Sequence, residues 1–171
     1  MSPRQTKTEQ PQPSPTLPPA PERSRLAESV DLKVLQGGVV VITPKKEDGG
    51  VPGYRYQALQ DLLLNLPLDS KILLNLKNLR GGDFIHEDGL NGQMIRRILH
   101  NDSANHKTFR ILGLPGSMRR ELKGLGFPTL PTVGTLADGV RRLGGKGAKV
   151  DTAATQSMAQ MLEQKLGPSR N

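Results

Sequence analysis

The chain has 171 residues, with 24 Lys and Arg against 16 Asp and Glu, a formal net charge of +8, 14 Pro, 19 Gly and no Cys or Trp. The absence of cysteine excludes a disulfide framework, a thiolate zinc site and a cysteine nucleophile. The sequence has no apolar run of about 18 residues and no apolar core of a secretory signal near its start, so we expect a cytoplasmic protein without a membrane span.

The first 25 residues hold seven of the 14 prolines and few apolar side chains. Such a segment buries too little apolar surface to offset the entropy lost on ordering. We therefore expect a disordered, proline-rich leader over residues 1–27, a folded domain over 28–144, and a flexible basic tail over 145–171. The Pro-x-Pro spacing leaves two interpretations of the leader open, a solvated spacer and a docking segment for a proline-binding module.

The expected domain opens with two short apolar segments. Residues 30–35 mostly alternate between apolar and polar side chains, and residues 39–43 form a β-branched run. Gly37 and Gly38 between them are a tight-turn signal. Together these features predict a β-hairpin.

Helical and strand-like patterns then alternate along the chain. Helices are expected where apolar residues recur every three or four positions, and strands where short apolar runs are bounded by turn residues. In chain order, the pattern predicts a helix over 56–66, a strand over 71–76, a helix over 91–100, a strand over 109–112, a helix over 115–125, a short edge strand over 129–133 and a helix over 135–143. A hairpin followed by such alternation is typical of an α/β fold with a mainly parallel sheet.

The C-terminal segment contains one further helical pattern, over residues 155–166, whose apolar side chains share one face. Isolated helices of this length are marginally stable in water. Three interpretations stay open: the helix packs on the core, it docks on a partner, or it frays.

After the third expected strand, which includes residues 72–76, the chain reads F-I-H-E-D-G-L over residues 84–90. This stretch resembles the STAS domain of the anti-sigma factor antagonist family, which reads approximately F-I-D-S-S-G-L there. A helix, a strand and two more helices follow in the family's order. The resemblance covers about residues 30–143 and implies an STAS-like mixed sheet with helices packed mainly on one face, flanked by flexible tails.

The resemblance also implies a switch loop that binds the partner. The residue two positions before the glycine is normally the Ser or Thr that a partner kinase phosphorylates, and Glu87 stands there. His86 replaces the family's Asp and Asp88 its second Ser, whereas Gly89 and Leu90 match. Both acids also precede an expected helix, where carboxylates face unpaired N–H groups. Either Glu87 partly imitates a phosphorylated serine, or the two acids only cap the helix.

Two further groups are candidates for binding. Arg96 and Arg97, on the helix expected after the loop, either contact a partner or form a solvated face. Gly116, Ser117 and Arg119 open a later helix and form a candidate anion or nucleotide site, the alternative being an ordinary helix start. The sequence lacks the Gly-Lys-Ser/Thr ending of a P-loop and the Gly-x-Ser-x-Gly pattern of a nucleophile elbow. We therefore expect no catalytic residue, no metal and no cofactor.

The resemblance implies a non-enzymatic regulator of transcription. We expect a standalone STAS-domain protein that binds an anti-sigma factor or a serine-kinase-like partner, and so frees a sigma factor. Two alternatives stay open: a STAS subunit or scaffold of a transport or other multi-protein complex, and a basic nucleic-acid-associated protein.

The position of the charge bears on the nucleic-acid alternative. Residues 1–25 hold four basic and two acidic side chains, and residues 141–171 hold six and two. A net charge of only +2 is left for residues 26–140. The sequence therefore predicts that any electrostatic binding resides in the two tails.

Overall fold

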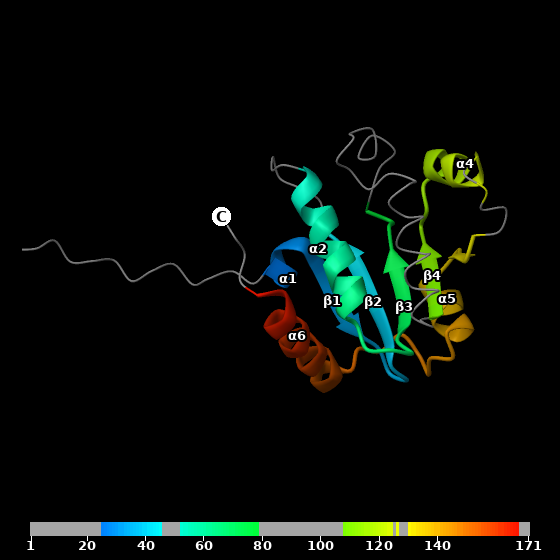
Figure 1. Ribbon diagram of the computed structural model, residues 1–171. Coiled ribbons are helices and arrows are strands. Elements are labelled where there is room, and N and C mark those ends of the chain that lie inside the picture. The colour runs from blue at the N-terminus through cyan, green and yellow to red at the C-terminus, as the bar shows by residue number, and fades with distance from the viewer. Residues whose placement is uncertain (1–24, 46–51, 79–107, 125, 127–129, 168–171) are drawn as a thin grey trace, which may run out of the picture.

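The computed structural model of the chain describes residues 25–45, 52–78, 108–124, 126 and 130–167. Within them, one mixed sheet has the strand order β1-β2-β3-β4-β5, with β1 antiparallel to β2 and the other neighbours parallel (Figure 1). The strands are β1 (Val30–Val34), β2 (Val39–Pro44), β3 (Lys71–Asn75), β4 (Thr108–Leu112) and β5 (Thr132–Val133). The predicted α/β class and the hairpin leading into parallel strands are confirmed.

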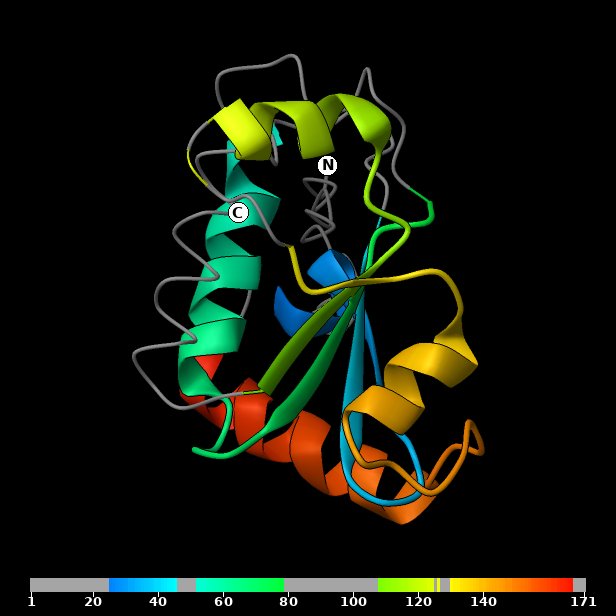
Figure 2. The same ribbon diagram turned by 90° about the vertical axis from the view of Figure 1, so that its right-hand side faces the viewer.

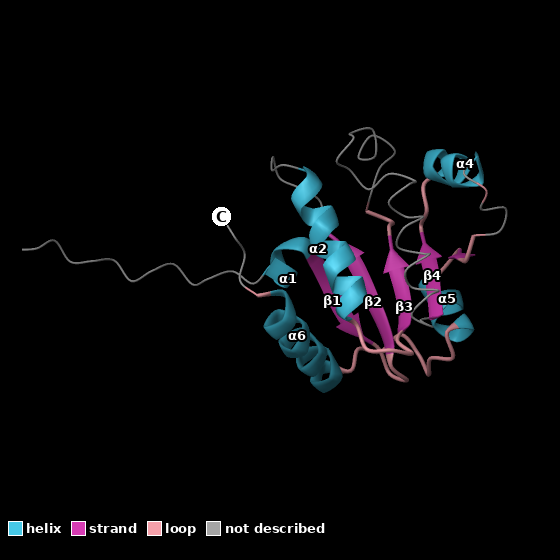
Figure 3. Cartoon of the chain, in the orientation of Figure 1, coloured by secondary structure: helices cyan, strands magenta, loops and turns pink. Residues whose placement is uncertain are grey.

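Helices lie on both sides of this sheet. They are α1 (Arg25–Ser29), α2 (Pro52–Asn65), α4 (Gly116–Gly124), α5 (Leu136–Arg142) and α6 (Thr152–Leu166). Figure 2 views the sheet nearly edge-on and shows α2 on one side and α5 on the other, and Figure 3 colours the same layers by type. The buried side chains accordingly form two core clusters, one on each face.

The larger core cluster lies between the sheet and helices α1, α2, α4 and α6. Ile42 and Ile72 reach it from the strands, and Leu59, Met118 and Leu162 from α2, α4 and α6, each at most 1% exposed. Full burial of one such side chain contributes about 1.5–3 kcal/mol. This cluster is therefore the main source of stability and fixes the positions of four helices.

The smaller core cluster lies on the opposite face, beneath α5. Val140 of α5 packs there with Val39 of β2 and Leu73 of β3. The helix begins where the sequence predicts, because the hydroxyl of Thr135 accepts a hydrogen bond from the backbone N–H of Asp138 at 3.1 Å.

Helix α6 packs on the core, the first of the three interpretations left open by the sequence. Leu162 is fully buried and Met158 is half-buried against the larger cluster. The start of the helix is tied to the outer edge of β1: the Val34 N–H donates to Thr155 Oγ1 at 2.9 Å, and the Asp151 N–H donates to the Val34 carbonyl at 2.8 Å.

The packed unit thus extends beyond the predicted limits of 28 and 144. Leu26 of α1 and Leu162 of α6 both belong to the larger core cluster. Helix α1 has only five residues, too few for a periodic pattern to show in the sequence. Helix α6 is held by residues more than 100 positions away, which its own sequence does not reveal.

Several element boundaries differ from the predicted ones for local reasons. Helix α2 begins at Pro52, a residue suited to a first turn, and α6 begins early because the Asp151 carboxylate caps the Ala154 N–H at 3.0 Å. Strand β5 has two residues, since Pro131 before it has no N–H to donate. The helix predicted over 91–100 lies outside the described residues. None of the helices that the structure describes is long and apolar enough to cross a membrane.

Candidate functional site

The predicted switch loop lies outside the described residues, as do the two arginines after it. The residues concerned are His86, Glu87, Asp88, Gly89, Arg96 and Arg97. The structure does show where the chain leaves β3 before this loop, because it describes the chain as far as Asn78, three residues beyond the strand. The parallel strands β2, β3 and β4 all end on this side of the sheet, which we call the carboxyl edge. In α/β sheets, ligands are commonly bound outside the carboxyl ends of the strands.

Two polar side chains lie at the carboxyl edge, on neighbouring strands. Asn75 Nδ2 donates a hydrogen bond to Thr43 Oγ1 at 3.3 Å, and Asn75 Oδ1 accepts one from the Lys77 N–H at 3.2 Å. The second bond fixes the direction in which the chain leaves β3. The sequence pattern did not single out Thr43 and Asn75, although each is a polar residue at the end of an apolar run.

Gly113, directly after β4, allows the chain to pass close to Lys77. The Leu76 N–H donates to the Leu112 carbonyl at 2.8 Å, which extends the pairing of β3 and β4. Gly113 has a φ of +74°, and a Cβ atom there would lie 2.6 Å from Lys77 Cγ and 2.9 Å from Lys77 Cα. Only glycine permits this approach. The segment leaving β3 and the turn entering α4 are therefore adjacent.

The predicted anion site lies at the start of α4. Gly116 and Ser117 are its first two residues, and Ser117 and Arg119 are exposed. The Arg119 N–H donates to the Pro115 carbonyl at 3.0 Å, so the N–H groups before it have no partner within the helix. Such groups can bind an anion, but they occur at every helix start. Both interpretations of this site therefore stay open.

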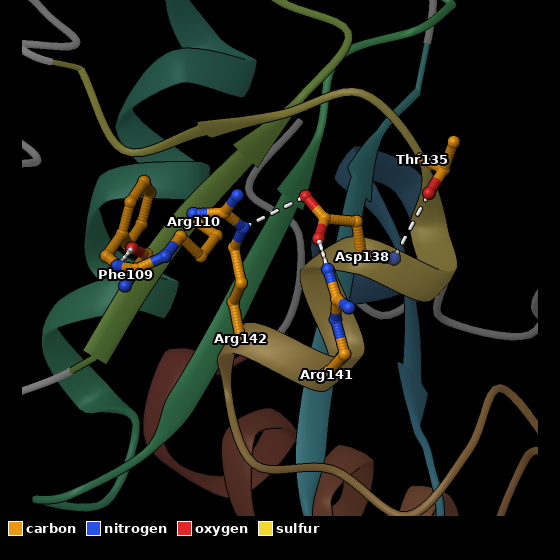
Figure 4. Close-up of polar contacts among 6 residues, drawn as sticks. All are labelled: Phe109, Arg110, Thr135, Asp138, Arg141 and Arg142. Carbon is orange, nitrogen blue, oxygen red and sulfur yellow. Dashed lines mark hydrogen bonds and ion pairs between the residues drawn. The ribbon is translucent and has the colours of Figure 1, made fainter.

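A further polar cluster lies on α5 (Figure 4). The Asp138 carboxylate accepts hydrogen bonds from Arg141 Nη2 at 2.6 Å and from Arg142 Nε at 3.0 Å. The Arg141 bond, aided by Arg142, holds the pKa of Asp138 below its usual value. On β4, which α5 contacts, Arg110 Nη1 donates to the Phe109 carbonyl at 2.7 Å. The sequence showed Asp138, Arg141 and Arg142 only as ordinary helix residues.

Comparison with models of known protein families gives no match, and a search among curated proteins gives no relative. Membership of the STAS family is therefore not shown by these comparisons. It stays a prediction from the residues that carry the resemblance.

Proposed function

We propose that the chain is a non-enzymatic STAS-like regulatory protein that binds an anti-sigma factor or a serine-kinase-like partner. The observation that carries the proposal is the position of β3. It is the third of the five strands that the structure describes, and the segment with Glu87 follows it in the sequence. The hairpin followed by parallel strands in sequential order supports the proposal as well, because the resemblance rests on that order of elements.

The charge at position 87 defines the expected state of the protein. A phosphoserine carries about −1.5 to −2 charges and three acceptor oxygens, whereas a glutamate carries one charge and two oxygens. In this proposal, the charge of Glu87 partly reproduces that of a phosphorylated serine. Unlike a phosphate group, this charge is permanent. The protein then holds one signalling state where the family alternates between two.

The partner is bound by surface complementarity, with residues 86–89 at the centre. Arg96 and Arg97 are the expected flanking contacts, and no cofactor takes part. The alternative role is that of a STAS subunit in a larger complex. Neither role requires a hydroxyl at position 87, so the identity of the partner distinguishes the two roles.

The test measures binding of the full chain to purified anti-sigma factors of the same organism that have a histidine-kinase-like ATPase domain. Isothermal titration compares the wild-type chain with Glu87→Ser and Glu87→Gln. We expect an affinity change of about tenfold, equivalent to about 1.4 kcal/mol, when the charge is removed. Glu163→Gln, which removes the charge of an exposed glutamate of α6, is the matched control and should bind like the wild type.

Two results would contradict the proposal. If no anti-sigma factor binds, the assignment of the partner is wrong. If one binds but both Glu87 variants keep the wild-type affinity within about twofold, the idea of a fixed charge state is wrong and Glu87 only caps a helix.

A further inference from the structure

Basic side chains gather on the side of the sheet that α5 covers. Lys33, Lys71 and Arg110 are cross-strand partners of residues in the smaller core cluster, so their side chains leave the sheet on the α5 side. Three more cations lie on α5 and in the loop after it. We call this surface the basic face, and its cations are Lys33, Lys71, Arg110, Arg141, Arg142 and Lys146.

The loop after α5, which carries Lys146, is fixed to the sheet. The Lys146 N–H donates to the Gln36 carbonyl at 3.0 Å, and the Gln36 N–H donates to the Lys149 carbonyl at 2.9 Å. Lys71 Nζ lies 3.5 Å from the Gly144 carbonyl oxygen and links β3 to the same loop. The charge that the sequence assigns to a flexible tail therefore belongs to the folded domain.

Carboxylates on the basic face are few. Among the described residues, Asp31 pairs with Lys33 at 3.1 Å and Asp138 pairs with the two arginines of α5. Asp151 lies further along, at the sheet edge, where it caps α6. Six cations against two acids leave an excess of four positive charges on one side of a small domain, enough to attract a polyanion.

The exposed residues of the basic face are not those of a protein interface. The large apolar side chains that are exposed in the described part of the chain are Leu64 and Leu68, in and after α2, and Val150 at the sheet edge. Protein interfaces centre on apolar and aromatic side chains and are depleted in lysine. Interfaces with nucleic acid are more polar and strongly positive, as the basic face is.

We propose that the basic face binds nucleic acid through the phosphate backbone, without reading the sequence. Lys and Arg side chains contact phosphates, which position a protein but do not specify bases. None of the cations is interleaved with an aromatic side chain in the described part of this face, so bases have nothing to stack on. This inference goes beyond the proposed function and does not depend on it.

The test is a fluorescence anisotropy titration of the full chain with a labelled, mixed-sequence DNA duplex of about 20 base pairs. Neutralising about four phosphates gives a slope of log affinity against log salt near −3.6, a loss of roughly 150-fold between 50 and 200 mM salt. A second duplex of unrelated sequence should bind equally well.

Two triple variants with the same net charge identify the surface. Lys33→Gln, Lys71→Gln and Lys146→Gln together should reduce the magnitude of the salt slope by about three and weaken binding accordingly. Arg120→Gln, Lys123→Gln and Lys165→Gln together remove three exposed charges from α4 and α6, which pack on the other core cluster, and should leave the slope unchanged. Thermal melts of both variants establish that they are folded.

Three results would overturn the proposal. The first is that the duplex fails to bind at low salt. The second is that both triple variants weaken binding equally, which indicates general charge attraction. The third is that a polyglutamate peptide binds the basic face and the duplex does not, which assigns the face to an acidic protein. A loss of duplex binding leaves the anti-sigma factor titration unaffected, so the two proposals fail separately.

Discussion

Gly113 shows how a residue without a side chain sets the geometry of the carboxyl edge. We expect Gly113→Ala to lower the free energy of unfolding by about 1–3 kcal/mol, since φ is positive and the new Cβ overlaps the backbone of Lys77. Urea denaturation followed by circular dichroism measures this loss. The control is Gly116→Ala in α4, where a Cβ meets nothing within 4 Å and the stability should be kept. Equal stability of the two variants would show that β4 and the Lys77 segment are not adjacent.

Asp138 makes a pH-dependent contribution to stability. Its folded pKa is lowered by the Arg141 and Arg142 hydrogen bonds, so the contribution is present above the unfolded pKa of about 3.9 and is lost as the pH falls through the folded value. Asp138→Asn should therefore have a lower Tm than the wild type at pH 7. The difference should shrink below about pH 4 and in high salt, because the cluster is on the surface. A difference that is constant down to about pH 2 would contradict the assignment.

Elements whose cause is local could be predicted from the sequence. The β1–β2 hairpin follows from alternation and two turn glycines, and α5 follows from a capping threonine and an apolar stripe. The contacts of α6 could not be predicted, because Thr155 bonds to Val34, 121 positions earlier in the chain. Helix α1 is stabilised by burial of Leu26, not by its own short sequence.

The candidate site was predictable only in part, for the same reason. Gly116, Ser117 and Arg119 lie at the start of α4, as the sequence predicts. The hydrogen bond between Thr43 and Asn75 depends on the parallel alignment of β2 and β3, which no local pattern encodes. The basic face was missed because it combines strand residues with a loop that the sequence assigns to a tail.

At the scale of the whole molecule, the cooperative unit runs from α1 to α6. Deleting residues 145–171 removes Leu162 from the core and the hydrogen bonds on the outer edge of β1. We expect this deletion to cost at least about 3 kcal/mol, since loss of a fully buried leucine alone costs about 2–5 kcal/mol. The free Val34 N–H and carbonyl also leave the edge strand open to pairing with other chains.

The matched deletion removes residues 1–24 and leaves Leu26 in place. We expect its urea midpoint to equal that of the full chain, because the core cluster begins at Leu26. Size-exclusion chromatography should show aggregation only for the chain without residues 145–171. If that chain instead unfolds cooperatively at the wild-type midpoint, α6 adds nothing to the core and the domain ends at 144, as the sequence pattern predicts. The basic residues beyond α5 would then belong to a tail after all, so the same two deletions also decide whether the charge of this chain is held on a fixed surface.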